Sequence, residues 1–309
     1  MSERQPSPKW QILSRTGCMT FVSVLLVIVA IVFSVCFPYY QKWRLLSDIY
    51  RSGGYFEFEF VSGWGVMDDL GSKYFGLEAW VQIRNDIKSI DFDDGHISDR
   101  LVRDISGIES LEELHLRNTQ LPEDLLAQFP ETTKFDFLMI YEYPQGAELD
   151  LKQLSTFGKL KYLGLIEMVV SDANLQQIGQ LSKIEYLWLP STNINSSRLK
   201  YLIHLPRLKF LRLNKTEVDD TGLKILQSMA SLTDLDLAET RITNEGLKSL
   251  VEMKNLETLN LSGTVVTDKG LSYLSKLTNL RFLDLTKTLV TPAGVKKLQK
   301  QLPKCDIQK

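Results

Sequence analysis

The stretch LKFLRLNKTEVDDTGLKILQSMAS, residues 208–231, decides the fold because the chain repeats it. The next row, residues 232–255, reads LTDLDLAETRITNEGLKSLVEMKN, and residues 256–279 read LETLNLSGTVVTDKGLSYLSKLTN. A fixed period of this length is typical of a solenoid, in which each row packs only against its neighbours. One row cannot bury its own leucines, so the rows are expected to stack.

Each row opens with the signature of a short strand. In Leu232, Leu235 and Leu237 the last two leucines are two residues apart, so they point to the same face of a strand. Thr240 follows at the ninth position, where its hydroxyl can bond the backbone of the adjoining loop. Thr243 can then cap a helix whose apolar stripe faces the strand. The pattern is that of a leucine-rich repeat and predicts an α/β solenoid, with a curved parallel sheet on the concave face and helices on the convex face.

About nine such rows are expected over residues 87–303. They begin at Ile87, Leu111, Phe135, Leu160, Ile184, Leu208, Leu232, Leu256 and Leu280. The row at Phe135 departs from the pattern, because it is one residue longer and Tyr143 replaces its ninth-position threonine; Met168 does so in the next row. Residues 304–309 are expected to close the stack as a C-terminal cap with a stub strand.

Residues 17–37 predict a transmembrane helix. The run from Cys18 to Phe37 is apolar and without charge, and at about 1.5 Å per residue it spans roughly 30 Å, the thickness of a bilayer core. The alternative is a cleavable signal peptide, whose apolar region is usually about 7–15 residues long and ends in small residues. Ser34-Val35-Cys36 matches such a site poorly. We therefore expect an uncleaved signal-anchor, with the membrane as a partner of the chain.

The charges around this run predict its orientation. The basic residues are Arg4, Lys9 and Arg15 before it, and Lys42, Arg44 and Arg51 after it. Because positive charge favours the cytoplasmic side and the segment before the run is short, residues 1–16 are expected to be a cytoplasmic tail. This predicts a single-pass protein of the cell membrane with its repeats on the extracytoplasmic side.

Residues 38–86 are expected to form a juxtamembrane helix and an N-terminal α/β cap. The helix reads KWRLLSDIYR, residues 42–51, and ends at Gly53-Gly54, where a left-handed backbone is easily adopted. Residues 55–61 then alternate aromatic and acidic side chains, as a strand does. The first row of a solenoid needs such a cover because it has no preceding row.

This order of segments resembles that of membrane-anchored leucine-rich-repeat proteins of bacteria, planctomycetes in particular. The residues that carry the resemblance are the rows Leu208–Gln301, Ser52-Gly53-Gly54 with Tyr55–Phe60, Tyr74-Phe75-Gly76, and Leu302-Pro303-Lys304-Cys305. The resemblance implies a location and an architecture, and it implies no established enzymatic activity.

The sequence contains no arrangement that predicts catalysis, so we expect no enzyme, no catalytic residues and no cofactor. His96, His115 and His204 fall in three different rows, and surface side chains explain them better than a metal or catalytic cluster does. Residues 91–95, DFDDG, lack the further ligands of a calcium loop, so no metal site is expected. The net charge is −2 and no basic stripe is present, which argues against a nucleic-acid partner. Three cysteines, two of them in the apolar run, exclude a disulfide framework.

The outward positions of the strands predict a binding surface. Positions three, five and seven of each row face the concave side, and equivalent residues of neighbouring rows lie about 4.8 Å apart. Position three is aromatic in four successive rows, and further apolar residues stand beside this file. The candidate binding residues are Phe137, Met139, Tyr141, Tyr162, Tyr186, Trp188, Phe210 and Arg212. Aromatics also stack on strands for stability alone, but an exposed cluster of this size usually marks an interaction site.

These residues lead us to expect a membrane-anchored, extracytoplasmic protein-protein interaction module that binds a protein or peptide on its concave aromatic face. Two alternatives stay open. The first is a binder of cell-envelope glycans, since aromatic faces also stack on sugars. The second is a structural envelope protein whose patch is covered by self-association.

Overall fold

The computed structural model describes residues 40–41, 44–58, 87–122, 125–130, 133, 136–143, 149 and 151–309. The chain divides into two compact units, Met1–Asp48 and Ile49–Lys309. In the first unit residues 44–48 are helical, and Arg44 Nε lies 3.9 Å from Asp48 Oδ2. The span expected at residues 17–37 and much of the expected cap lie outside the described residues, so both stay predictions. Among the helices that are described, none is both long and apolar enough to cross a bilayer.

The second unit is built on one sheet whose strands follow sequence order from β1 to β11. The strands are β1 Gly54–Phe58, β2 Ile87–Asp93, β3 Glu113–Arg117, β4 Phe137–Tyr141, β5 Tyr162–Ile166, β6 Tyr186–Trp188, β7 Phe210–Arg212, β8 Asp234–Asp236, β9 Thr258–Asn260, β10 Phe282–Asp284 and β11 Asp306–Gln308. β1 pairs antiparallel with β2, and every later pair is parallel. The predicted parallel solenoid is confirmed.

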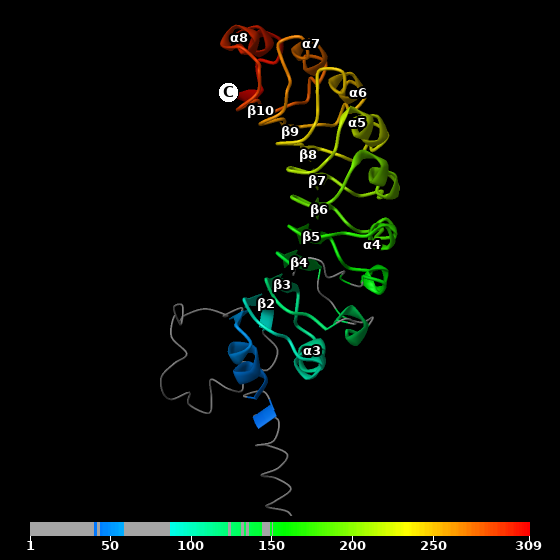
Figure 1. The fold of residues 1–309 in the computed structure, drawn as a ribbon, viewed down its shortest axis with the longest axis vertical. Helices are drawn as coiled ribbons and strands as arrows, with labels where there is room; N and C mark the ends of the chain where they lie inside the picture. The colour runs from blue at the N-terminus through cyan, green and yellow to red at the C-terminus, as the bar shows by residue number, and fades with distance from the viewer. Residues whose placement is uncertain are drawn as a thin grey trace, which may run out of the picture. The chain divides into compact units, whose positions relative to one another are not determined.

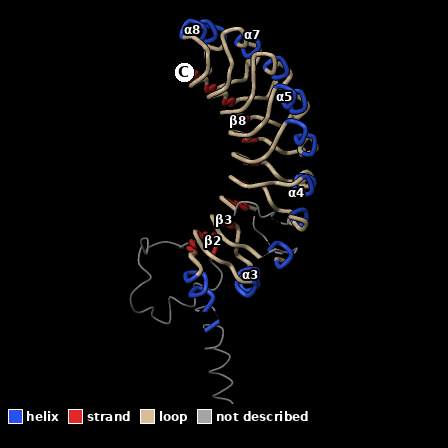
Figure 2. The backbone as a smooth tube through the Cα atoms, viewed as in Figure 1, coloured by secondary structure: helices blue, strands red, loops and turns tan. Residues whose placement is uncertain are grey.

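Helical segments connect the strands and lie on the outer side of the arc that the strands line (Figures 1 and 2). The α-helices are α3 Asp99–Ser106, α4 Asp172–Ile178, α5 Asp220–Leu226, α6 Leu247–Leu250, α7 Leu271–Leu274 and α8 Pro292–Gln301. The 3₁₀ helices are η2 Leu125–Gln128, η3 Leu154–Thr156 and η4 Ser196–Tyr201. Short helices on one side and strands on the other bend the stack, so the sheet forms its concave face.

The core is a ladder of leucines between the sheet and the helices. Leu211, Leu235, Leu259 and Leu283 pair in register along β7 to β10, and none of them is more than 1% exposed. Burying one such side chain stabilises the fold by about 1.5–3 kcal/mol. Every row adds the same set, which is why the repeat is visible in the sequence.

A tight turn follows each strand. The residue at position eight adopts a left-handed backbone, with φ of 57° at Lys215, 55° at Glu239 and 71° at Gly263. The next residue is the buried threonine, and Thr240 Oγ1 donates to Leu237 O at 2.5 Å. The threonine hydroxyl thus bonds the backbone of its own turn, at the carbonyl three residues back.

The helix starts agree with the sequence at Asp219 and Thr291, and α6 starts later than the sequence suggests. Asp219 caps α5 by accepting from Thr221 N at 2.9 Å, and Thr291 caps α8 by accepting from Gly294 N at 3.0 Å. Thr243 makes the same kind of bond, since its Oγ1 accepts from Glu245 N at 3.2 Å, but the α-helix that follows, α6, begins only at Leu247. The reason is that the residues after Thr243 form a turn first, and the Thr243 hydroxyl donates to Asp220 in the preceding row at 2.6 Å.

Candidate functional site: the concave aromatic file

Strands β4 to β7 place the aromatic residues of position three in one line. Phe137 pairs with Tyr162, Tyr162 with Tyr186, and Tyr186 with Phe210 in the sheet register. Because neighbouring parallel strands are about 4.8 Å apart, in-register rings can stack on one another. All four side chains are half-buried. We call these four residues, together with Trp188, the aromatic file.

The four position-three rings of the file stack on one another with small interplanar angles. Ring centroids are 5.6 Å apart for Phe137 and Tyr162, 4.6 Å for Tyr162 and Tyr186, and 6.0 Å for Tyr186 and Phe210. Interplanar angles in these three pairs are 29°, 18° and 28°. Offset stacking of this kind contributes about 0.5–1.5 kcal/mol per pair beyond burial. The file is therefore a preformed surface with few rotamers to lose on binding.

Trp188 lies against all four of the other rings. Its ring centroid is 5.9 Å from that of Tyr186, 6.3 Å from Tyr162, 5.8 Å from Phe210 and 6.1 Å from Phe137. One residue, from position five of β6, thus joins rows β4 to β7. It is the centre of the aromatic file.

Gly164 and Pro190 distinguish the surroundings of this tryptophan from those of position five in later rows. Gly164 stands opposite Trp188 in β5 and has no side chain. A Cβ on Gly164 would lie 1.7 Å from Met139 Sδ, so Met139 occupies the space from the other side. Pro190, two residues after Trp188, has no N–H. In later rows the side chain at position five accepts a hydrogen bond from the backbone N–H at position seven, as Asp236 Oδ1 does from Ala238 N at 3.0 Å. In the row of Trp188 position seven is Pro190, so no N–H there needs an acceptor at position five.

Polar side chains cover the two ends of the aromatic file. The His115 ring stacks on Phe137 with centroids 4.7 Å apart, and the Arg212 guanidinium carbon lies 5.6 Å from the Phe210 ring centroid. Both contacts put a polar or cationic group on the face of a terminal ring. Each of the four rings at position three therefore has neighbours on its faces, so we infer that these rings present their edges to the concave surface.

The predicted site residues do not all have the same place in the structure. Phe137, Tyr162, Tyr186, Trp188, Phe210 and Arg212 come together as expected. Tyr141 stands beside them on β4 with the Arg117 guanidinium carbon 5.4 Å from its ring centroid, and burial raises its pKa above the ordinary value. Met139 is only 6% exposed, so it packs beneath the file and offers little contact surface.

Sequence reasoning missed two members of this surface, His115 and Gly164. His115 occupies position five of β3, one row before the aromatic residues begin, and its register was visible in the sequence. The sequence predicted only that His115 is a surface side chain, and its place at the end of the file was not predicted. Gly164 carries no side chain to draw attention, and its role depends on Met139 and Trp188 in the rows on either side.

Acidic residues stand on the concave face on both sides of the aromatic file. At the β2–β3 side, His115 Nδ1 is 3.6 Å from Asp91 Oδ1, and its Nε2 is 3.5 Å from Glu113 Oε2. At the β8 side, Asp234 and Asp236 follow Phe210 and Arg212 in register. Arg212 Nε lies 3.3 Å from Asp236 Oδ2. Burial nevertheless holds the pKa of Asp236 above its ordinary value, against the opposing effects of the Ala238 N–H and Arg212.

The family comparison agrees with this geometry. Residues 228–251 and 252–275 each match the family model described as Leucine Rich repeat. The chain folds as a leucine-rich-repeat protein. No curated protein sequence matches it.

Solved structures of two Listeria monocytogenes str. 4b F2365 proteins resemble this leucine-rich-repeat chain. An internalin (inlF) is 16% identical with a TM-score of 0.53, covering 75% of this chain and 69% of that one. An internalin C2 (inlC2) is 21% identical with a TM-score of 0.51, covering 65% of this chain and 81% of that one. At these identities the likeness shows the fold alone.

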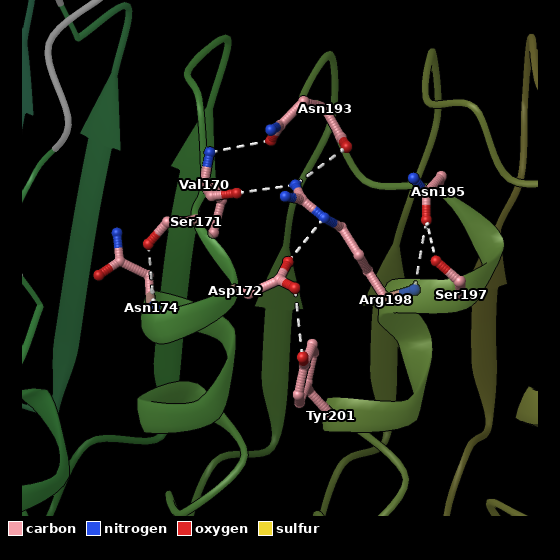
Figure 3. Close-up of polar contacts among 9 residues, drawn as sticks. All are labelled: Val170, Ser171, Asp172, Asn174, Asn193, Asn195, Ser197, Arg198 and Tyr201. Atoms are coloured by element: carbon pink, nitrogen blue, oxygen red, sulfur yellow. Dashed lines mark hydrogen bonds and ion pairs between the residues drawn. The ribbon is translucent and has the colours of Figure 1, made fainter.

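A polar network joins the leucine-rich repeats that carry Tyr162 and Trp188, after their strands (Figure 3). Arg198 Nη1 donates to Val170 O at 3.0 Å and to Asn193 O at 3.3 Å, and Arg198 Nε lies 2.8 Å from Asp172 Oδ1. Tyr201 donates its hydroxyl proton to Asp172 Oδ2 at 3.2 Å. Each residue drawn makes at least one hydrogen bond or ion pair with another of them, so we assign the network a structural role: it holds successive rows in place.

Within the described ranges, no three His, Cys, Asp or Glu side chains are grouped so that they could hold a metal ion. Cys305 is buried, and burial raises the pKa of its thiol to about 11, so the thiol is protonated near neutral pH. The aromatic file is the candidate functional site.

Proposed function

We propose that this leucine-rich-repeat protein is a protein-protein interaction module that binds a protein or peptide on its concave aromatic face. The observation that carries the proposal is the contact of Trp188 with four half-buried rings. Such a cluster keeps apolar area on the surface while its geometry is already fixed. Large, rigid aromatic side chains lose little entropy on binding, which is why Trp and Tyr so often anchor protein interfaces.

The arrangement of the rings favours a peptide over a sugar. A sugar ring stacks on the face of an aromatic ring, but here His115 and Arg212 lie on the terminal faces and the inner rings lie on one another. The exposed edges carry C–H groups and the hydroxyls of Tyr162 and Tyr186. Peptide carbonyls can accept from these hydroxyls, and apolar side chains can pack on the C–H edges.

We also propose that the module is anchored in the cell membrane with its repeats on the extracytoplasmic side. The support is the apolar run at residues 17–37 and the basic residues Arg4, Lys9 and Arg15 before it. A cysteine introduced in the repeats, for example Ser228→Cys, should be labelled by a membrane-impermeant maleimide on intact cells. Labelling that requires cell lysis would reject this orientation.

The test of the binding site is capture of a partner from solubilised cell envelope by the full chain in a nonionic detergent. The Tyr186→Ala, Trp188→Ala double variant should lose the captured protein, while Tyr273→Ala in α7, on the helical side, should retain it. An unchanged circular dichroism spectrum in the double variant shows that the solenoid is intact. Capture that survives the double variant would reject the concave site.

The alternatives predict different results in the same preparation. A glycan binder would give signal on a glycan array, and capture would survive protease treatment of the bound material. A self-associating structural protein would sediment with the mass of two chains in the wild type and of one chain in the double variant.

A further inference from the structure

Resting on the proposed function, we infer the chemistry of the ligand: an extended peptide segment that crosses the strands and carries basic side chains at both ends of an apolar centre. The concave face combines three features in sequence along the sheet. An acidic group on β2 and β3 precedes the aromatic file, and a second acidic group on β8 follows it. The ligand is expected to be complementary to all three.

The first acidic group consists of Asp91 and Glu113. Both side chains are about half exposed, at 47% and 49%, and both lie within 3.6 Å of the His115 ring that ends the aromatic file. The second consists of Asp234 and Asp236, which follow Phe210 and Arg212 in register. Since Arg212 already pairs with Asp236, a ligand at this end meets Asp234 as the further carboxylate.

The charge balance of the face favours a cation over an anion. Besides His115, which contacts Asp91 and Glu113, the basic residues at positions three, five and seven of the described rows are Arg117 and Arg212, and each has a carboxylate close by. Arg117 Nε lies 3.9 Å from Glu142 Oε1, and Arg212 Nε lies 3.3 Å from Asp236 Oδ2. Basic side chains on a ligand would therefore meet a negative field at either end, strongest at low salt.

The spacing of the two acidic groups sets the length of the segment. From β3 to β8 there are five steps between neighbouring strands, about 24 Å in all. An extended peptide rises about 3.3 Å per residue, so its basic residues would stand roughly seven positions apart. The residues between them would lie over the aromatic file, where the hydroxyls of Tyr162 and Tyr186 make no hydrogen bond within the described part of the protein.

The experiment uses three fluorescein-labelled pools of nine-residue peptides whose five central positions are random mixtures of Leu, Ile, Val, Phe and Pro. The pools carry two Arg, two Gln or two Glu at each end. Binding to the full chain in nonionic detergent is followed by fluorescence anisotropy. We expect the Arg pool to bind at least tenfold more tightly than the Gln pool at 50 mM salt and the difference to shrink at 500 mM salt.

Single substitutions test which carboxylates cause the preference for the Arg pool. Asp234→Asn and Glu113→Gln should each weaken binding of the Arg pool about three- to tenfold and leave the Gln pool unchanged. Glu252→Gln removes the same charge from the helical side and should change neither pool. Equal binding of the Arg and Gln pools, absence of binding by the Arg pool, or insensitivity to Asp234→Asn and Glu113→Gln would each overturn the inference. If Trp188→Ala still abolishes capture of the envelope partner, the proposed function stands although the ligand chemistry was wrong.

Discussion

Asp220 of one row holds the backbone of the next row at Thr243. Its Oδ1 accepts from Thr243 N at 2.8 Å, and its Oδ2 accepts from Thr243 Oγ1 at 2.6 Å. Asn244 and Asp268 repeat the arrangement one and two rows later, on Thr267 N at 3.0 Å and Thr291 N at 2.7 Å. These bonds join successive rows at the start of the helical side, away from the leucine ladder of the sheet.

Removing this acceptor should weaken the stack. Asp220→Ala leaves the Thr243 N–H without its partner and is expected to lower the free energy of unfolding by about 1–2 kcal/mol. Asp220→Asn should cost less, because Asn244 makes both bonds to Thr267 with an amide. Urea unfolding followed by far-ultraviolet circular dichroism measures both. An equal loss in the two variants would show that charge, and not the hydrogen bonds, stabilises the junction.

The same aspartate explains why glycine occurs at the fifteenth position of these rows. A Cβ on Gly246 would lie 2.3 Å from Asp220 Oδ1, and one on Gly294 would lie 2.3 Å from Asp268 Oδ1. Gly246→Ala is therefore expected to cost about 1–3 kcal/mol, although alanine favours helices more than glycine does.

A double-mutant cycle tests that cause directly. In a chain that already carries Asp220→Ala, the substitution Gly246→Ala should cost clearly less, because the carboxylate that crowds it is gone. Additive losses in the two single variants and the double variant would mean that Gly246 is needed for its backbone and not for space.

Gly164 leaves room for Met139 opposite Trp188. Gly164→Ala brings a Cβ to 1.7 Å from the present position of Met139 Sδ, so the methionine has to move. We expect a loss of about 1 kcal/mol and a changed near-ultraviolet circular dichroism spectrum, since the rings of the aromatic file are displaced. Adding Met139→Ala should restore the spectrum toward that of the wild type. A spectrum that Gly164→Ala leaves unchanged would mean that the aromatic file does not depend on the room that Gly164 leaves for Met139.

Asp236 should make stability depend on pH. Burial raises its folded-state pKa above the unfolded value, so its contribution to stability is fully present below the unfolded pKa and is lost as pH rises through the folded pKa. Asp236→Asn removes this titration, and its side-chain oxygen can still accept from Ala238 N, as Asn260 Oδ1 does from Ser262 N at 2.9 Å.

The variant should therefore gain in stability relative to the wild type as pH rises from about 4 to 7, and this gain should be absent below about pH 4. Thermal unfolding of both proteins between pH 3 and pH 8 gives the comparison. A difference that stays constant over this range would contradict the assignment to Asp236.

Much of the fold could be predicted because the repeat fixes the spacing of the leucines and the length of each row. Leu235 and Leu237 must share one face of a strand, and rows of equal length must stack in register. The threonine at position nine and the caps at Asp219 and Thr291 also follow from local rules of hydrogen bonding. Prediction was weaker where two rows meet, as at Thr243, whose hydroxyl bonds the preceding row while its helix starts four residues later.

The aromatic file was partly predictable for the same reason. Position three repeats every row, so the line from Phe137 to Phe210 follows from the period. The burial of Met139, the stacking of His115 on Phe137 and the contact of Trp188 with four rings could not be read from one row. Each depends on which rotamer a side chain adopts among neighbours from other rows.

By itself the sequence determined the strand period, the buried leucines and the row that each aromatic residue occupies, because these follow from spacing along one chain. The tertiary structure decided what lies between rows: the carboxylate of Asp220 over Gly246, and the side chain of Met139 over Gly164. Such contacts depend on distances between residues more than twenty positions apart, and only packing in three dimensions sets those distances.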